Sequence, residues 1–600
     1  MIFKKKHLNK QFKSFNYFYS YLKNKIFIAV FLSLSVGILG GFGLTMFLPL
    51  LQMVNDTGEI NSDNLGNLSF IVENLENLGV NLNLLNILMV MIVFFVFKGI
   101  AQYLSRLYRI ILQQNFVKEM RVKMLNSLNE ISFNYFVKSD VGRIQNTMTG
   151  EVEKVTLAFN FYFQSIEQFI LVTTYTLFTL FIDFQFSILV ILGGALTNII
   201  YRTIYKQTKN ASRSLTKDTN YYQGQVIQHV NNYKYLKATG LINKFGNKLK
   251  LSIEKIEINR KRLGIFSSIM SASREPLIII VLATIILIYT KIIGGSLAGV
   301  LLTLLFFYRA LTALVQMQNS WNKYLENTGS IENVMDFQSK LENKYESDGK
   351  INFKEFNDKI KLANINYSYN DTRVLNKINI ELKKNKSYAF IGESGSGKTT
   401  LINIIVGLLS TDCGLITVDG LNYKDIVKSS FQRRIGYITQ ETVIFNDSIF
   451  NNITFWAEKT QDNLYKYESI IKKAYLSDMI NQFPEKSETL LGNNGINLSG
   501  GQKQRISIAR ELFKDVDILV LDEATSSLDT ETEKNIQNSI DSLKDSYTLL
   551  VIAHRLSTIK NIDTIFLIEN GEIVEKGDFN YLIKKRPSFR NLVKLQVLQK

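Results

Sequence analysis

The chain has 600 residues but only one cysteine, Cys413, and this scarcity excludes several kinds of protein. An internal disulfide needs two cysteines and a multi-cysteine zinc site needs more, so the fold depends on neither. The sequence also has no internal repeat of about 20 to 50 residues and no low-complexity tract. A small secreted disulfide scaffold and a zinc ribbon are therefore excluded, and nothing indicates a repeat array.

Long apolar runs divide the chain into two unlike parts. The first part contains six runs of the length that crosses a bilayer as a helix, about 20 residues, whereas the second alternates short apolar strands with polar helices. The first run is too long for the apolar core of a signal peptide and has no small-residue cleavage site after it, so we interpret it as a retained span. The six predicted spans are residues 26–54, 84–105, 163–182, 184–205, 264–290 and 294–318.

Lysine and arginine are distributed unevenly around the predicted spans. The formal net charge is +17; residues 1–25 carry seven lysines and no acidic residue, whereas residues 55–83 carry acidic residues and no basic residue. Because basic segments stay on the cytoplasmic side, the N-terminus and the basic connections after the second and fourth spans are predicted to be cytoplasmic. A charge excess beside apolar spans indicates anionic lipid headgroups, rather than nucleic acid, as its partner.

A polar stretch separates the membrane part from the soluble part. From Met335 to Lys359 the residues are polar and of mixed charge, without a long apolar periodicity, which is typical of a linker. We therefore predict a transmembrane domain over residues 1–325, a linker over 326–360 and a soluble domain over 361–600. The soluble segment has the length of one domain.

A glycine-rich loop follows a short apolar strand that ends at Ile391. The loop fits the pattern G-x-x-x-x-G-K-[ST] and precedes an apolar helix, which is typical of a phosphate-binding loop. In such a loop, backbone N–H groups converge on phosphate oxygens, Lys398 reaches the terminal phosphates, and the Thr399 hydroxyl is a ligand for Mg²⁺. A plain Gly-Ser turn is the alternative. The predicted binding residues are Gly392, Glu393, Ser394, Gly395, Ser396, Gly397, Lys398, Thr399 and Thr400.

A second apolar strand, Ile518–Leu521, is followed by two acidic residues, Asp522 and Glu523. Ligands of α/β sheets bind beyond the carboxyl ends of the strands, so both side chains are predicted to face a ligand. Asp522 is predicted to ligate Mg²⁺, and Glu523 is predicted to orient and deprotonate the attacking water as a general base. A helix N-cap cluster is the alternative for these acidic residues and the hydroxyl residues after them.

Between these two elements, Leu498–Gln502 reads Leu-Ser-Gly-Gly-Gln and precedes a helical pattern. Together with the phosphate-binding loop, it resembles the signature sequence of ATP-binding cassette (ABC) proteins. Further residues resemble motifs of this family in their order along the chain. Tyr369 resembles the adenine-stacking aromatic residue, and Gln440 resembles the Q-loop glutamine, which has roles in metal binding and catalysis. Asp529 resembles the D-loop aspartate, and His554 resembles the catalytic switch histidine, for which a structural strand-end histidine is the alternative.

The resemblance implies an α/β ABC nucleotide-binding domain that binds ATP and Mg²⁺ and works as a pair. In this family two such domains meet head to tail, so Ser499 and Gly501 of one subunit contact the γ-phosphate held by Lys398 of the other. ATP binding closes the pair and hydrolysis opens it. Because the motifs of the half-site are intact, a homodimer is expected, with a heterodimer as the alternative. The signature residues are Ser499, Gly500, Gly501 and Gln502.

The six-span part resembles the all-α transmembrane domain of type IV ABC exporters over residues 15–325. In that fold the two cytoplasmic connections end in short coupling helices, for which the candidates are residues 133–145 and 228–239. A solvent-facing helix is the alternative for both candidates. One departure from the family pattern precedes the signature, because Asn493 stands where many exporters carry an acidic residue. The resemblance therefore implies ATP hydrolysis more firmly than it implies coupling contacts near Asn493.

Charged residues within the predicted spans are the clue to the transported substrate, because an unpaired arginine costs at least about 2.5 to 3.5 kcal/mol there. Arg274, Glu275 and Arg309 are such residues. In a dimer, arginines from both subunits around one cavity would bind the phosphates of an anionic headgroup. An internal arginine–glutamate pair that holds the bundle together is the alternative.

The surroundings of Arg274 and Arg309, with residues 391–394 and 445–449, resemble bacterial lipid-linked oligosaccharide flippases within the ABC exporters. This resemblance implies an ATP-driven flippase of a polyprenyl-pyrophosphate glycan in a bacterial cytoplasmic membrane. Lipid A flippases, multidrug exporters and small-peptide exporters are the alternatives. A peptidase-containing exporter is disfavoured because there is no N-terminal cysteine nucleophile. From another class, a membrane-anchored ATPase module without transport is a further alternative.

Overall fold

The computed structural model describes residues 13–47, 49–50, 83–293, 301–344, 348–522, 541, 543–553, 558–587, 589–590 and 593. These residues fall into two compact units that each use two stretches of the chain. The first unit comes from Met1–Ile131 and Lys138–Tyr345, and the second comes from Ser132–Val137 and Glu346–Lys600.

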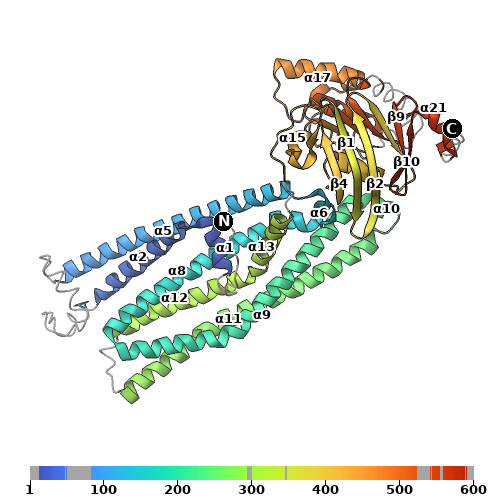
Figure 1. Ribbon diagram of the computed structural model, residues 1–600. Helices are drawn as coiled ribbons and strands as arrows, with labels where there is room; N and C mark the ends of the chain where they lie inside the picture. The colour runs from blue at the N-terminus through green and yellow to red at the C-terminus, as the bar shows by residue number, and fades with distance from the viewer. Residues whose placement is uncertain are drawn as a thin grey trace. The chain divides into compact units, whose positions relative to one another are not determined.

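The first unit is built from long helices (Figure 1). Its pairs α8 and α12, α9 and α11, and α2 and α5 pack side by side. Helix α5 alone has 46 residues, and at a rise of 1.5 Å per residue it is about 70 Å long, about twice the apolar thickness of a bilayer. The helices are α1 Lys13–Leu22, α2 Lys25–Thr45, α5 Leu84–Asn129, α6 Phe133–Lys138, α7 Val141–Asn146, the π-helix η2 Thr147–Glu151, α8 Val152–Ile182, α9 Phe184–Asn231, α10 Tyr233–Ala238, α11 Ile242–Ile288, the π-helix η3 Tyr289–Ile293, α12 Leu301–Glu326 and α13 Thr328–Asn343.

Four stretches among the described residues are long and apolar enough to cross a membrane: Lys25–Thr45, Leu84–Asn129, Val141–Ile182 and Ile242–Lys291. They contain most of the predicted first span and all of the second, third and fifth. Helices α9 and α12 contain the predicted fourth span and most of the sixth, although neither is among the four. Parts of the predicted first and sixth spans, namely residue 48, residues 51–54 and residues 294–300, lie outside the described residues.

Helix α13 occupies a stretch that the sequence predicted to be a linker. Its side chains Ile331, Val334, Phe337 and Leu341 are buried, and their spacing of three and four residues forms one apolar face of a helix. This face packs against α5, α8 and α9. The polar residues between these positions conceal the periodicity in the sequence, which is why the stretch resembles a linker.

The two predicted coupling segments are helical over part of their length. The first contains α6 and α7, and Asp140 lies between these helices. The carboxylate of Asp140 accepts a hydrogen bond from the backbone N–H of Arg143 at 3.2 Å and so caps α7. Residues Ser132–Val137 group with the second unit, where Phe133 packs against the core. The second segment contains the end of α9 and helix α10, on which Tyr233 and Tyr235 are exposed.

The second unit contains two sheets and surrounding helices. Strands β2, β1, β4 and β5 form an antiparallel sheet in that order. The larger sheet has the order β10-β9-β3-β8-β7-β6 and is parallel except for β10. The strands are β1 Lys359–Tyr369, β2 Thr372–Lys383, β3 Ser387–Ile391, β4 Cys413–Val418, β5 Leu421–Asn422, β6 Ile435–Ile438, β7 Ile518–Asp522, β8 Thr548–Ile552, β9 Thr564–Glu569 and β10 Glu572–Gly577. The helices are α14 Lys398–Ile405, α15 Lys428–Gln432, α16 Ile449–Thr454, α17 Gln461–Lys473, α18 Ser477–Gln482, α19 Gly500–Phe513 and α21 Phe579–Lys585.

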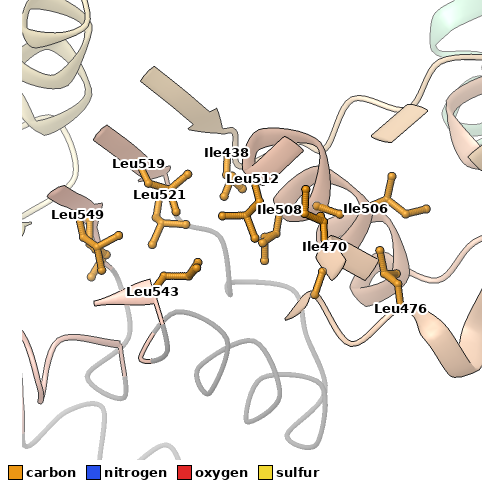
Figure 2. Packing of buried hydrophobic residues seen from close by; sticks show 14 of the residues in the cluster. Ile438, Ile470, Leu476, Ile506, Ile508, Leu512, Leu519, Leu521, Leu543 and Leu549 are labelled. Carbon is orange, nitrogen blue, oxygen red and sulfur yellow. The ribbon is translucent and has the colours of Figure 1, made fainter. Parts of the chain in front are cut away.

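The parallel strands are buried on both faces, which explains their nearly continuous apolar sequence. Successive residues of β7 alternate between two hydrophobic clusters: Leu519 and Leu521 belong to one, and Ile518 and Val520 belong to the other. Figure 2 shows Leu519 and Leu521 in the first cluster, together with Leu512 of α19. This cluster joins the sheet to helix α19. The predicted order of an all-α part followed by an α/β part is confirmed.

Candidate nucleotide-binding site and membrane-span charges

The glycines of the phosphate-binding loop are required by close backbone contacts. A Cβ atom on Gly392 would lie 2.1 Å from the carbonyl oxygen of Ile568. Gly397 has φ +101° and caps α14, and a Cβ atom there would lie 2.8 Å from a side-chain carbon of Leu375. Because real Cβ atoms do not tolerate such distances, any other residue would push the loop away from the end of β3.

Lys398 folds back over this loop. Its ammonium group donates hydrogen bonds to the carbonyl oxygens of Gly392 at 2.9 Å and Glu393 at 2.8 Å, and the side chain is buried. Ser396 is also buried, and its hydroxyl oxygen has no hydrogen-bond partner within the described part of the chain. Thr399, in the first turn of α14, is exposed. A tight glycine cradle, a buried ammonium group, an unpaired hydroxyl and a helix N-terminus together fit a bound phosphate chain.

Asp522 lies at the carboxyl end of β7, between β8 and β6 in the parallel sheet. Its carboxylate accepts a hydrogen bond from the Tyr437 hydroxyl of β6 at 3.1 Å. Burial raises the pKa of Tyr437, and the nearby negative charge of Asp522 raises it further. The tyrosine therefore stays protonated and orients the carboxylate. Nothing in the sequence around Tyr437 distinguishes it from a core tyrosine.

The sheet brings several predicted residues to one edge. Because β3, β6, β7 and β8 are parallel, their carboxyl ends meet there. The phosphate-binding loop follows β3, Asp522 ends β7, and the exposed Gln440 follows β6 by two residues. Three further predicted residues, Glu523, Asp529 and His554, lie outside the described residues, so their roles stay predictions.

Tyr369 ends β1, in the antiparallel sheet. Its ring is partly exposed and meets the ring of Tyr367 edge to face, with centroids 5.0 Å apart at 88°. Tyr367 is almost fully buried. The inner ring therefore supports the outer one and leaves a face of Tyr369 for stacking.

The signature residues form the start of α19. The Ser499 hydroxyl accepts a hydrogen bond from the backbone N–H of Gln502 at 3.3 Å, and the Gln502 side chain accepts one from the backbone N–H of Ser499 at 2.8 Å. This reciprocal pair is a capping box. Ser499 and Gly500 are exposed, whereas Gly501 is buried. The serine thus has a structural role within its own helix besides the role that the family resemblance implies.

Arg510 is a structural residue that sequence reasoning missed. Its guanidinium donates to the carbonyl oxygens of Asn452 at 2.6 Å and Val443 at 2.7 Å, and to the Asn452 side chain at 2.9 Å. It also lies over the rings of Phe445 and Phe455, 5.2 and 5.6 Å from their centroids. These contacts fasten the signature helix to the segment that follows Gln440. An arginine in an amphipathic helix gives no sequence signal of such burial.

The three charged residues of the predicted substrate site lie in the first unit and do not share one environment. Arg274 is 3% exposed, and its Nε atom has no hydrogen-bond partner within the described residues. Glu275 and Arg309 are exposed. Among the described residues, Glu275 forms no ion pair with either arginine; Arg274 is its neighbour in α11, and successive helix positions point about 100° apart. The described residues therefore give no support to the alternative of an internal arginine–glutamate pair.

Lys98 of α5 is a charged residue within the predicted second span that the sequence reasoning overlooked. A Cβ atom on Gly40 of α2 would lie 3.1 Å from its ammonium nitrogen and 2.9 Å from the hydroxyl of Tyr175 on α8. Arg309 lies on α12, which packs against α8 and α2. Helices α2, α5 and α8 therefore converge on one cation and one hydroxyl. A charge count within the spans would have found this lysine.

Comparison with known proteins places this arrangement in a family. The family model described as the ABC transporter transmembrane region matches residues 26–315, and the model described as ABC transporter matches residues 375–526. The chain belongs to the ABC transporter family. The second match contains the phosphate-binding loop, Gln440, the signature and Asp522, while Tyr369 precedes it.

Similar proteins share both parts of the chain. An ATP-dependent lipid A-core flippase of Syntrophus aciditrophicus is 29% identical over 525 residues, 84% of each chain. The heterocyst differentiation ATP-binding protein HepA of Nostoc is 29% identical over 487 residues, 81% of this chain and 80% of HepA. A bacterial Atm1-family ABC exporter solved with ATP bound has a TM-score of 0.76 at 20% identity, covering 96% of this chain and 99% of the exporter.

These matches identify the protein as an exporter-type ABC half-transporter, with a membrane-embedded helical region and an ATP-binding unit in one chain. Hydrolysis of ATP coupled to transport follows from the same family membership. Neither the name of the flippase nor that of HepA mentions a lipid-linked oligosaccharide. These comparisons therefore do not identify that substrate.

Proposed function

We propose that this ABC transporter works as a homodimer that uses ATP to move an anionic lipid across a bacterial cytoplasmic membrane, with a lipid-linked oligosaccharide as the substrate. The N-terminus and the nucleotide-binding units face the cytoplasm in this proposal. The observation that carries it is that Lys98, Arg274 and Arg309 lie in apolar helices of the membrane unit and form no ion pair among the described residues. Cations in apolar spans are costly unless an anion offsets them.

In the nucleotide-binding unit, each predicted residue has a task that follows from its position. Lys398 would hold the terminal phosphates. Its ammonium group donates hydrogen bonds to two loop carbonyls, and oxygens of a bound phosphate would take the place of these carbonyls as acceptors. Thr399, Gln440 and Asp522 would hold Mg²⁺, which supplies charge neutralisation on the phosphates when bound. Tyr437 orients Asp522 for that task. Tyr369 offers its ring face to the adenine.

Glu523 is assigned the general base, because it follows Asp522 at the end of β7. It would take a proton from the attacking water, while His554 would donate to the γ-phosphate and Asp529 would contact the opposite subunit. Ser499 and Gly501 of the partner subunit would complete the site at the γ-phosphate. Helix α19 adds its positive N-terminal dipole to these donors, so the bound triphosphate holds the two subunits together until it is cleaved.

In the membrane unit, the cations would bind the headgroup of the lipid. Arg309 presents a planar guanidinium that can bind a phosphate through two parallel hydrogen bonds, whereas Lys98 acts as a point charge. Tyr175 adds a hydroxyl beside Lys98. Arg274 is buried on α11 near Tyr201 and Tyr205 of α9, and it would take part when the helices rearrange. A dimer doubles each of these charges, which suits a pyrophosphate-linked headgroup.

A lipid A substrate is the second candidate, because two similar proteins carry the name lipid A-core flippase. One is the protein of Syntrophus aciditrophicus, and the other is that of Escherichia coli K12, at 27% identity over 516 residues. Both candidates present phosphates beside sugars, so the same cations serve either. The difference between them lies in the lipid tail and in the number of phosphates. Binding of the two lipids to one preparation therefore separates the candidates.

The test uses the full protein reconstituted in vesicles with polyprenyl-pyrophosphate oligosaccharide or lipid A. We expect the oligosaccharide lipid to stimulate ATP hydrolysis and to become accessible in the opposite leaflet. In the Arg274→Ala, Arg309→Ala variant, basal hydrolysis should stay within about twofold, whereas stimulation and flipping should fall at least about tenfold, since each charge-assisted hydrogen bond contributes about 1.5 to 3 kcal/mol.

The control is Arg260→Ala, which removes an exposed arginine that, within the described residues, pairs with Glu257 of the same helix. It should leave both readouts unchanged. Stimulation by lipid A alone would replace the oligosaccharide assignment. ATP hydrolysis without movement or stimulation by either lipid, by dyes or by peptides would contradict the flippase and favour a membrane-anchored ATPase.

A further inference from the structure

The first unit has a basic pocket at the junction between α1 and α2, away from the residues assigned to cargo. It has a volume of about 730 Å³ and is lined by Ser20, Tyr21, Leu22, Lys23, Asn24 and Lys25, with Glu119 and Lys123 of α5. Helix α1 packs against both α2 and α5. Because the apolar, membrane-length helix α2 begins at Lys25, the pocket lies where the chain passes from polar to apolar surroundings.

Two of the three pocket lysines carry charges that the protein does not offset. Lys23 and Lys25 are exposed, and neither forms an ion pair within the described part of the chain. Lys123 differs, because its ammonium group lies 2.7 Å from a carboxylate oxygen of Glu342 on α13. Glu119 is the acidic residue among those lining the pocket. The pocket therefore has a net positive charge that Lys23 and Lys25 supply.

The backbone at Lys23 is held in a conformation that lysine disfavours. Its φ is +49°, in the left-handed region where glycine and asparagine are more stable. The backbone N–H of Lys23 donates to the carbonyl oxygen of Tyr19 at 2.8 Å, which ends α1 and turns the chain toward α2. A lysine is thus present at a helix end where a smaller residue would be more stable.

We propose that this pocket binds the phosphate headgroup of an anionic lipid in the cytoplasmic leaflet, as a peripheral lipid distinct from the cargo. Lysines beside the start of a span meet lipid phosphates at that depth, and each contributes attraction to an anionic membrane surface. Glu119 repels additional negative charge, so the pocket suits a headgroup with a single phosphate. The inference rests on the proposed function for the cytoplasmic side of the N-terminus, but it does not depend on which molecule is transported.

The test measures lipid binding to the full protein by native mass spectrometry, with dioleoylphosphatidylglycerol as the probe and dioleoylphosphatidylcholine as the uncharged comparison. The variant combines Lys23→Asn with Lys25→Gln, because asparagine tolerates the left-handed backbone and so keeps the junction intact. Two lysines at a membrane surface correspond to roughly thirtyfold in affinity. We therefore expect phosphatidylglycerol binding at one site to weaken by about that factor, with phosphatidylcholine unaffected.

The matched control is Lys244→Gln with Lys250→Gln, which removes the same charge from exposed positions of α11. Wild-type binding in the pocket variant, or an equal loss in this control, would overturn the proposal. Displacement of the bound lipid by soluble glycerol phosphate would also overturn it, because the site would then recognise a free anion.

The Arg274→Ala, Arg309→Ala variant separates this inference from the proposed function. It should lose stimulation by the cargo lipid but keep phosphatidylglycerol binding at the pocket. Loss of that binding in the arginine variant, with retention in the pocket variant, would assign the bound lipid to the cargo site and overturn the proposal. Failure of flipping alone would leave the pocket assignment unaffected.

Discussion

In the nucleotide-binding unit, polar groups hold the functional side chains in place, whereas Arg274 and Arg309 of the membrane unit form no ion pair with any residue that the structure describes. Lys398 has two backbone carbonyls as partners, and Ser499 is fixed by a capping box. Arg274, by contrast, is buried with an unpaired Nε atom, and Arg309 is exposed. A preorganised site suits a single ligand, ATP, whereas unpaired cations suit an anion that binds and then dissociates.

The same difference extends to the connections within each unit. Arg510 fastens α19 to the segment after Gln440 through three hydrogen bonds, so the signature helix and that segment move together. In the membrane unit, α13 has partly exposed ion pairs, such as Arg143 with Asp336 at 2.8 Å and Arg213 with Glu332 at 2.6 Å, beside its buried apolar face. Such pairs contribute little stability. The apolar face therefore contributes most of the attachment of α13.

The largest expected effect tests whether catalysis belongs wholly to the nucleotide-binding unit. Glu523→Gln should lower the rate of ATP hydrolysis by roughly 10²- to 10⁴-fold, because it removes the carboxylate proposed as the general base. ATP binding should persist, and paired subunits should accumulate in size-exclusion chromatography or crosslinking. Glu468→Gln, an exposed carboxylate of α17, serves as the control and should hydrolyse ATP normally. A normal rate of ATP hydrolysis in Glu523→Gln would show that Glu523 is not the general base.

The next effect tests the rigidity of the same unit. Arg510→Ala should destabilise the protein by about 3 kcal/mol, because it removes the charged donor to the buried carbonyl oxygen of Asn452 and a second hydrogen bond to the Asn452 side chain. The thermal unfolding midpoint should fall by about 6 to 12 °C for a unit of this size. Arg590→Ala is the matched control, because Arg590 also donates to two carbonyl oxygens but is exposed. Equal shifts for the two variants would contradict the role of burial.

The smallest effect separates the two roles of the signature serine. Ser499→Ala and Ser448→Ala each remove an N-cap hydroxyl and should each cost about 1 kcal/mol of stability. Only Ser499→Ala should also lower ATP hydrolysis, by about tenfold or more, because a hydrogen bond to a charged phosphate contributes about 1.5 to 3 kcal/mol. The free energy of unfolding and the rate of ATP hydrolysis, measured on both variants, separate the capping role of Ser499 from its role at the phosphate. Equal hydrolysis in the two would restrict Ser499 to capping.

The nucleotide-binding unit was largely predictable because its chemistry depends on local backbone geometry. Gly392 and Gly397 are needed where a Cβ atom would collide, and Lys398 follows them at a fixed spacing. A short sequence motif therefore carries most of the information. Tyr437 and Arg510 escaped prediction, because their partners come from strands and loops far away in the sequence.

The membrane unit was predictable in its helices but less so in its contacts. Apolar length indicates a span, yet Lys98 was overlooked, and the ion pair between Arg109 of α5 and Glu167 of α8 at 2.5 Å was not foreseen. Helix α13 was interpreted as part of a linker because its apolar face is interrupted by polar residues. Side-chain pairing across helices depends on rotation and register, which hydropathy does not specify.

The sequence by itself determined the order of the two parts, the membrane helices by their apolar length, and the phosphate-binding loop by glycines that no other residue can replace. Only the tertiary structure decided which polar side chains meet: Tyr437 with Asp522, Arg510 with Asn452, and Arg109 with Glu167. The physical reason is that chain length, propensity and steric exclusion act between neighbours along the chain. Electrostatic and hydrogen-bond partners are instead chosen by packing, which brings distant residues within a few ångströms of one another.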